Sequence, residues 1–173
     1  MAIVRASLTL RIGTAGGSFA GEGAATRKID GTSCKIKGGR FFKRRELRKD
    51  DATPIGFVSE GTDGETGKTV GWVAVGDGPE DRFHCEAFAR QATWPDGTFE
   101  LVGPKIQGNL EHYEQHNLVA HDDPALVLTG VPAEFDKLRE WLAGKDIEGV
   151  VWHHLDGRMA KIKLRDFGLK RPK

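Results

Sequence analysis

The sequence predicts an α+β domain in which antiparallel sheets are flanked by helices. Glycine is abundant, at 23 of 173 residues, which is typical of many short strands joined by tight turns. Asp-Gly and Gly-Gly pairs lie between extended segments, where such pairs indicate turns. Helical spacing of apolar residues is clear only in short stretches, above all at 132–142. At this length we expect a single domain, residues 1–173, with a core of its own.

Residues 3–12 are a plausible strand, and three more strands are expected between residues 24 and 45. Residues 1–23 are rich in glycine but are followed by no G-K-S/T motif, which favours a flexible arm over a phosphate-binding loop. A strand should then end at Lys28, before a tight turn at 30–31, because glycine adopts positive φ without steric cost. Residues 32–36 should be extended and should turn at 38–39 into the third strand.

The middle of the chain predicts further short elements. Residues 57–58 and 70–75 are expected to be extended, with polar turns between them at 59–69. Residues 83–90 have apolar positions at helical spacing. The next strand carries Glu100 among apolar neighbours, and a carboxylate in that setting requires a cation or hydrogen bonds.

The last third predicts a helix followed by a hairpin. Residues 132–142 begin with proline and carry an apolar stripe, which indicates a helix. Residues 148–152 form an apolar strand opened by a glutamate, and a turn at 156–157 leads into a strand with alternating lysines. Side chains in a strand repeat every two residues, so Lys161 and Lys163 share one face.

Composition excludes some classes of protein. Lys and Arg number 26 against 25 Asp and Glu, so no overall basic field points to nucleic acid, and local clusters matter more. No apolar run approaches the ~20 residues that a membrane helix requires, and no signal-peptide pattern is present. Cys34 and Cys85 form no C-x-x-C pair, so we expect reduced thiols in a cytoplasmic protein. We also expect the protein to be a monomer.

Two stretches suggest chemistry of different strength. His112 and His116 would share a face of a helix, but Glu114 is misplaced for the H-E-x-x-H pattern of a zinc site. The motif K-x-D-G, beginning at Lys28, suggests covalent catalysis, because a neutral lysine amine attacks electrophiles such as phosphates. Alone this short motif more often marks a surface turn, but the two lysines beside Glu148 near the other end would suit a triphosphate with its metal.

Five ordered segments together resemble a known family. They are K-I-D-G at 28–31, the basic run 43–45, F-E-L-V-G-P-K-I-Q-G-N at 99–109, E-G-V-V-W at 148–152 and K-I-K-L at 161–164. This order resembles the lysine-adenylating nucleotidyltransferase superfamily of ATP-dependent ligases and capping enzymes, and within it the RNA ligases. The resemblance implies an ATP-grasp-like adenylation domain. It further implies an enzyme that joins 5′-phosphate and 3′-hydroxyl RNA ends through lysyl-AMP and adenylated RNA.

The resemblance also implies roles for individual residues. Lys28 would be the nucleophile, and Lys161 and Lys163 would offset charge on the α-phosphate. Arg44 would reach the sugar and phosphate of the nucleotide, with Lys43 or Arg45 as substitutes. The other implied ATP contacts are Asp30, Gly31, Glu100 and Glu148. Glu148 and Glu100 are also the expected ligands of Mg²⁺ or Mn²⁺. Val127 would make an aliphatic contact with the base of the nucleotide.

Two departures from the family keep alternatives open. Many relatives have a glutamate before the lysine, where this chain has Arg27, so a preference for ATP over GTP stays open. The chain also ends ten residues after Lys163, which leads us to expect no appended OB or C-terminal domain. A minimal RNA ligase, or the catalytic part of a longer protein with a separate RNA-binding domain or partner, would fit. The rivals are a DNA ligase or capping guanylyltransferase, and a non-catalytic nucleotide- or RNA-binding relative.

Overall fold

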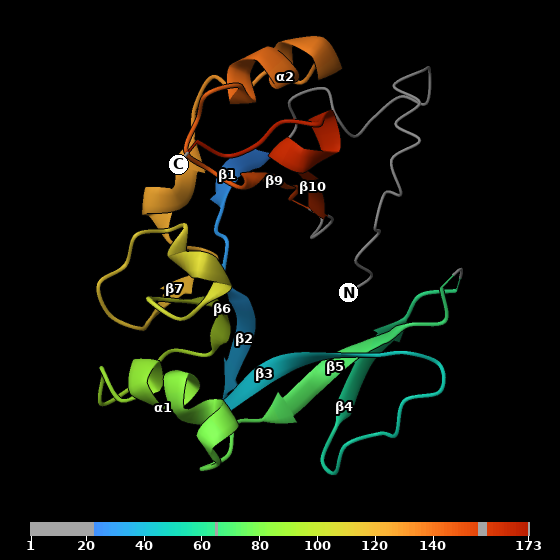
Figure 1. Cartoon of the computed structure of the whole chain (residues 1–173), viewed down its shortest axis with the longest axis vertical. Helices are drawn as coiled ribbons and strands as arrows, with labels where there is room; N and C mark the ends of the chain where they lie inside the picture. Colours follow the sequence, from blue (N-terminus) through green and yellow to red (C-terminus); the bar gives the residue numbers. More distant parts are fainter. Residues whose placement is uncertain (1–22, 65, 156–158, 173) are drawn as a thin grey trace. The chain divides into compact units, whose positions relative to one another are not determined.

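The computed structural model describes residues 23–64, 66–155 and 159–172, which form two compact units (Figure 1). The described part of unit 1 comprises residues 23–29 and 123–172 without 156–158. Unit 2 comprises residues 30–122 without residue 65. Both units combine antiparallel strands with short helices, as the fold class predicts. The expected arm at 1–23 and the turn at 156–157 fall, apart from Gly23, outside the described residues.

Unit 1 is built on a four-stranded antiparallel sheet with the order β10-β9-β1-β8. The strands are β1 (Ala24–Lys28), β8 (Val127–Leu128), β9 (Gly149–His153) and β10 (Met159–Lys163). The helix α2 (Phe135–Leu142) and the 3-10 turns η3 (Pro124–Leu126) and η4 (Leu164–Phe167) complete the unit. The strands expected at Lys28, at 148–152 and around the alternating lysines are therefore confirmed.

One face of α2 closes the core of unit 1. Leu138 and Leu142 pack with apolar side chains of β1, β9 and β10, so the stripe that predicted the helix is the buried one. The helix ends at the expected residue but begins three residues later than predicted. Glu134 is extended and occupies the N-cap position, which places Pro132 in the preceding loop.

Unit 2 is built on a six-stranded antiparallel sheet with the order β4-β5-β3-β2-β6-β7. The strands are β2 (Thr32–Lys37), β3 (Arg40–Leu47), β4 (Val58–Thr62), β5 (Thr69–Ala74), β6 (Gly97–Val102) and β7 (Asn117–Ala120). The helix α1 (Arg82–Phe88) and the 3-10 turns η1 (Pro79–Asp81) and η2 (Gln107–Asn109) accompany them. Ala87 of α1 packs with Cys34, Ile36 and Phe41, so α1 covers one face of the sheet.

The turn at 38–39 is a two-residue hairpin, as predicted. Gly38 and Gly39 have φ of 56° and 71°, and Lys37 pairs with Arg40 across the turn. Two successive residues with positive φ match the twist of hairpin strands, and glycine adopts this geometry most readily. The turn therefore fixes which residues of β2 and β3 lie side by side.

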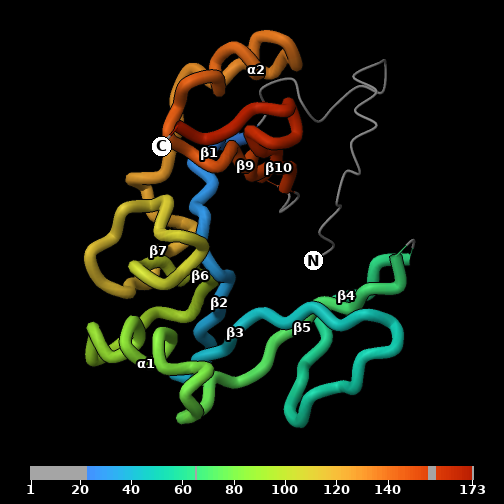
Figure 2. Tube along the Cα trace, in the orientation of Figure 1, coloured from blue at the N-terminus to red at the C-terminus, as the bar shows by residue number. Residues whose placement is uncertain are grey.

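The pair at 30–31 is not the tight turn that the sequence predicted. β1 and β2 belong to different sheets, and in Figure 2 the chain passes from one into the other without a hairpin. Gly31 is not among the residues with positive φ. It is needed for a different reason: a Cβ there would lie 2.4 Å from the carbonyl oxygen of Leu101.

Two polar stretches also differ from expectation. The strand β4, which pairs with β5, occupies part of the region expected to be turns. The prediction missed it because its exposed residues show no alternation of apolar and polar positions. Residues 110–116 contain no helix, and His112 has a φ of 56°, so the two histidines share no helix face. The strand β7 follows, and the sequence analysis did not predict it because it has only four residues. No helix in the described part of the chain is long and apolar enough to cross a membrane.

Candidate active site around Lys28

Three strands of unit 1 bring Lys28 and Lys163 to the two sides of one glycine. Lys28 in β1 and Lys163 in β10 both pair with Gly149 of the central strand β9. Directly opposite residues in antiparallel strands point to the same face. Gly149 adds no side chain between the lysines, and a Cβ there would lie 2.1 Å from the carbonyl oxygen of Ile162. Glycine at position 149 thus allows the central strand β9 to lie close to its neighbour β10.

Glu148, just before β9, joins the two lysines. Its Oε2 accepts a hydrogen bond from Lys28 Nζ, and its Oε1 lies 2.5 Å from Lys163 Nζ. Lys28 Nζ also donates to the carbonyl oxygen of Ile29 at 3.2 Å. All three side chains are largely buried, with 15–20% of their surface exposed. The cluster is therefore a carboxylate held between two cations in a partly dehydrated site.

The charge on Glu148 follows from these neighbours. Burial alone would raise the pKa of this carboxyl group, but the charge of Lys28 and hydrogen bonds from Lys163 and Lys28 outweigh burial. The pKa of Glu148 is therefore held below its ordinary value. Lys161 lies two residues before Lys163 on the same face of β10 and is more exposed, while Ile162 between them is buried.

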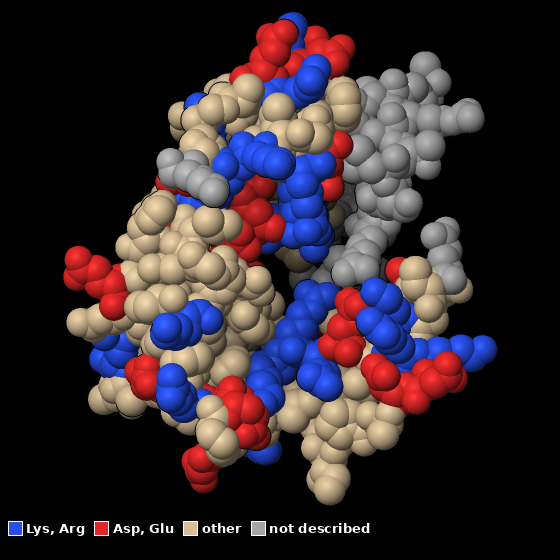
Figure 3. All heavy atoms as spheres, in the orientation of Figure 1, with Lys and Arg blue, Asp and Glu red and all other residues tan. Residues whose placement is uncertain are grey.

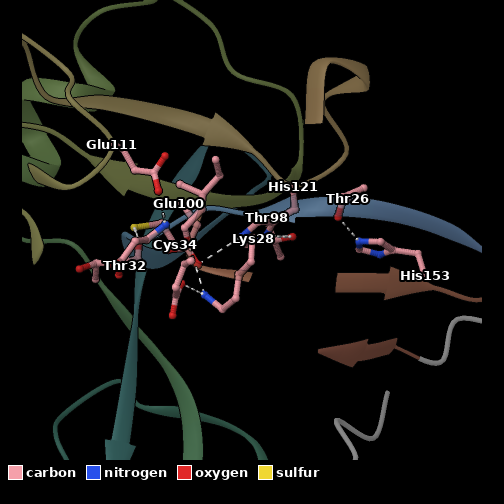
Figure 4. Close-up of polar contacts among 12 residues, drawn as sticks. Thr26, Lys28, Thr32, Cys34, Thr98, Glu100, Glu111, His121 and His153 are labelled. Carbon is pink, nitrogen blue, oxygen red and sulfur yellow. Dashed lines mark hydrogen bonds and ion pairs between the residues drawn. The ribbon is translucent and has the colours of Figure 1, made fainter. Parts of the chain in front are cut away.

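Among the other nucleotide contacts expected from the sequence, Val127 lies exposed in β8 of unit 1. The contacts expected at Asp30, Gly31, Arg44 and Glu100 lie in unit 2. The backbone N–H of Asp30 donates to Glu111 Oε1 at 3.0 Å (Figure 4). Glu100 of β6 has its Oε1 3.5 Å from His121 Nε2, and no described residue forms a hydrogen bond to its Oε2. Its carboxylate adds to the effect of burial in raising the pKa of the neighbouring Cys34 thiol.

The basic run of β3 is divided between the two faces of the sheet. Lys43 follows Phe41, a core residue, on the face covered by α1, and it forms an ion pair with Asp81. Arg45 belongs to the same alternate set and is exposed. Arg44 belongs to the other set and pairs across the sheet with Trp72. Lys43 is thus engaged in a structural ion pair, whereas Arg44 lies on the face that α1 does not cover.

Comparison with known proteins assigns the family. A family model described as RNA ligase 1 matches residues 87–173, half of the chain. The chain belongs to the RNA ligase 1 family. RNA ligase 1 of Danio rerio is 35% identical over 85 residues, which cover 43% of this chain and 25% of that protein. The chain therefore spans about a quarter of the length of this curated relative.

The match divides the candidate site of this RNA ligase 1 family member. The matched residues contain Glu100, Glu111, Glu148 and both lysines of β10, whereas Lys28 precedes them. The loop at 103–113 also lies inside the match. Asn109, with a φ of 54°, closes that loop by bonding through its side chain to both the N–H and the carbonyl of Tyr113. This is a structural role that the sequence did not predict.

Several polar contacts of the RNA ligase 1 chain were missed by sequence reasoning. Thr26 Oγ1 lies 3.0 Å from His153 Nε2, linking β1 to β9 two residues before Lys28 (Figure 4). Glu111 stands in an irregular loop, where no pattern indicated its contact with the backbone. Asp81 is 2% exposed, and Lys43 and the N–H of Gly76 hold its pKa below the ordinary value despite burial. The one sequence signal for this ion pair was a charged residue, Asp81, directly before a helix with apolar positions.

No group of three or more His, Cys, Asp or Glu side chains in the described part of the chain could hold a metal ion on its own. A dedicated metal cage is therefore not built from these residues. The two carboxylates expected from the sequence to bind the ion are Glu148, in unit 1, and Glu100, in unit 2.

Proposed function

We propose that this chain is the adenylation domain of an ATP-dependent RNA ligase with the nucleotidyltransferase fold. The observation that carries the proposal is the sharing of one largely buried carboxylate, Glu148, by Lys28 and Lys163. Both lysines were expected from the sequence to act on the same phosphate. Membership of the RNA ligase 1 family supports RNA as the substrate class.

In the proposed first step, neutral Lys28 attacks the α-phosphorus of ATP. A bond forms from Nζ to phosphorus, the bond to the bridging oxygen breaks, and pyrophosphate leaves, which gives lysyl-AMP. Attack requires a neutral amine, so Lys28 has to leave its hydrogen bond to Glu148 and give up a proton before it reacts. Lys163, and Lys161 on the same strand face, would then offset the charge on the phosphate.

The family resemblance supports proposals for four further residues. We propose that Arg44 contacts its sugar and phosphate and that Glu100 contacts the ribose. The backbone at Asp30 and Gly31 would border the nucleotide, held in place by Glu111 and the close approach to β6.

Mg²⁺ or Mn²⁺ fits this proposal as an ion that arrives with ATP. Such ions commonly take one or two protein carboxylates and complete their shell with phosphates and water, so no three-residue cage is required. Either Glu148 or Glu100 would supply a carboxylate, and no described residue forms a hydrogen bond to the Oε2 of Glu100. The ion would supply charge neutralisation for the leaving pyrophosphate.

Incubation with α-labelled ATP and Mg²⁺ tests the first step. The label should remain on the protein after denaturation, and Lys28→Ala should abolish it while the fold is retained. Lys28→Arg should also fail, because guanidinium stays protonated and cannot attack. Labelling of Lys28→Ala at the level of the parent would refute the assignment. The same assay with GTP decides between the two nucleotides.

Pre-adenylated RNA tests the later steps. AMP passes from Lys28 to the RNA 5′-phosphate, and a 3′-hydroxyl then displaces AMP and seals the strand. Sealing of RNA that already carries AMP would show that the domain joins ends without the ATP step. Formation of lysyl-AMP without sealing would mean that a further domain or partner completes the enzyme.

A further inference from the structure

One face of the unit 2 sheet carries cations that rest on aromatic rings. The β2–β3 register pairs Lys35 with Phe42 and Lys37 with Arg40, so these four side chains share a face. Cys34, Ile36 and Phe41 alternate with them and lie in the core beneath α1. The face that carries the four residues is therefore the one that α1 does not cover. Figure 3 shows Lys and Arg atoms gathered over the part of unit 2 that β2 and β3 form.

Two of these cations are ordered by the rings. Lys35 Nζ lies 5.3 Å from the centroid of the Trp72 ring, and the guanidinium of Arg40 lies 5.5 Å from that of Phe42. Cations over aromatic faces at this range are attracted to the ring. Because each ring already carries a cation, neither ring is open on that side for stacking of a base. The surface therefore offers ordered positive charge, with little provision for reading bases.

Carboxylates on and beside this face offset the cations only in part. Glu60 lies 4.0 Å from Lys35 Nζ, at the limit of an ion pair, and both groups are about a third exposed. Glu46 is matched by Lys68 at 2.8 Å. Glu100, on the neighbouring strand, faces His121. Exposed ion pairs are weak, so the ammonium of Lys35 stays available to a stronger anion.

We propose that Lys35, Lys37 and Arg40 form the surface that binds the RNA backbone through its phosphates, without regard to base sequence. The inference rests on the proposed function, because it takes RNA as the substrate. Affinity from phosphate contacts falls with salt, and each neutralised phosphate of a single strand contributes ~0.7 to the slope of log K against log salt. Three contacts thus contribute about two to that slope.

The test compares a neutralised variant with a matched control in the full chain. The variant is Lys35→Gln with Lys37→Gln and Arg40→Gln, which removes three positive charges and keeps unbranched polar side chains. The control is Arg82→Gln, because Arg82 also places its guanidinium over a ring, 4.5 Å from that of Phe83, but on α1. The probe is a fluorescein-labelled oligouridylate with a 5′-phosphate, titrated by anisotropy at several salt concentrations. Unfolding followed by tryptophan fluorescence checks that each variant is folded.

The expected result is a slope reduced by about two in the triple variant. Over a fourfold rise in salt, the parent should then lose about twenty-fold more affinity than the variant. Arg82→Gln should bind like the parent, and oligoadenylate should bind like oligouridylate. An equal loss in Arg82→Gln, or a strong preference for one base, would overturn the inference.

Labelling by α-labelled ATP separates this inference from the proposed function. If the parent takes the label but the triple variant binds RNA as tightly as the parent, the surface assignment is wrong and an acidic protein becomes the better partner. If the parent takes no label but the triple variant shows the expected loss, the RNA surface stands and the catalytic proposal fails.

Discussion

Replacement of Glu148 by glutamine tests the physical basis of the candidate site. The substitution keeps the shape of the side chain but leaves two ammonium groups, those of Lys28 and Lys163, without their shared counter-charge. The amide oxygen can still accept a hydrogen bond from one of them. We expect unit 1 of the Glu148→Gln variant to be less stable at neutral pH and unchanged in strong acid.

The magnitude follows from the two ion pairs. Unit charges ~4 Å apart at an effective dielectric constant of ~20 attract by about 4 kcal/mol per pair. Desolvation of the three groups opposes this gain, and removal of one partner from a fully buried pair costs ~3–5 kcal/mol. Each side chain here keeps 15–20% exposure, so we expect the variant to lose about 2–3 kcal/mol.

Urea unfolding measures the loss, with tryptophan fluorescence as the probe. Trp141 and Trp152 both pack against the core of unit 1 and report on it. Glu134→Gln is the matched control, because Glu134 pairs with Lys137 at 2.8 Å on the surface of α2, where both groups are more than 60% exposed. An exposed pair of this kind contributes little, so the control should unfold like the parent.

The pH dependence gives the outcome that would refute this reasoning. The pKa of Glu148 is lower in the folded chain than its ordinary value of 4.5. Its contribution to stability is therefore complete above that value and is lost as the pH falls through the folded pKa. In acid the parent carries a neutral carboxyl group and should match the variant. A difference in unfolding free energy that stays constant from neutral pH into acid would show that Glu148 does not act through its charge.

Three further expectations concern other residues. Lys161→Ala and Lys163→Ala should each suppress labelling by α-labelled ATP, and labelling of both at the parent level under limiting ATP would show that neither reaches the phosphates. Gly31→Ala should destabilise unit 2 by about 1–3 kcal/mol in urea unfolding, because its Cβ would lie 2.4 Å from a backbone oxygen of β6. Gly61→Ala is its control, since no atom lies within 4 Å of that Cβ; equal effects would refute the steric account. Asp81→Asn should cost unit 2 about 2–4 kcal/mol by leaving its lysine partner in β3 without a counter-charge, and a loss under 1 kcal/mol in the same assay would contradict that reasoning.

Local pattern predicted most of the strands and the pairing of the basic hairpin. Alternation placed Lys161 and Lys163 on one face of β10, and the turn at 38–39 set the register of β2 and β3. Both signals depend on residues close together in the sequence. The resemblance to RNA ligases added the expectation that Lys28 acts with residues near the end of the chain. The structure places Lys163 and Glu148 beside it.

The remaining contacts depend on long-range packing, which leaves no periodic signal. Glu111 reaches the backbone of Asp30 from an irregular loop 81 positions away. Asp81 binds Lys43 from the start of a short helix. β4 is exposed along its whole length, so pairing with β5 alone makes it a strand. In each case the partner belongs to another element of the chain, which the amino-acid pattern of a single element does not encode.

The motif K-x-D-G has a structural meaning that differs from a turn. Lys28 is the last residue of β1 and is fixed by its pairing with Gly149, whereas Gly31 is fixed in unit 2 by its approach to Leu101. Only Ile29, which is buried, and Asp30, held by Glu111, stand between them. The short spacing therefore anchors the proposed nucleophile at the point where the chain leaves one unit for the other. The physical requirement at Gly31 is thus the absence of a Cβ, and positive φ plays no part in it.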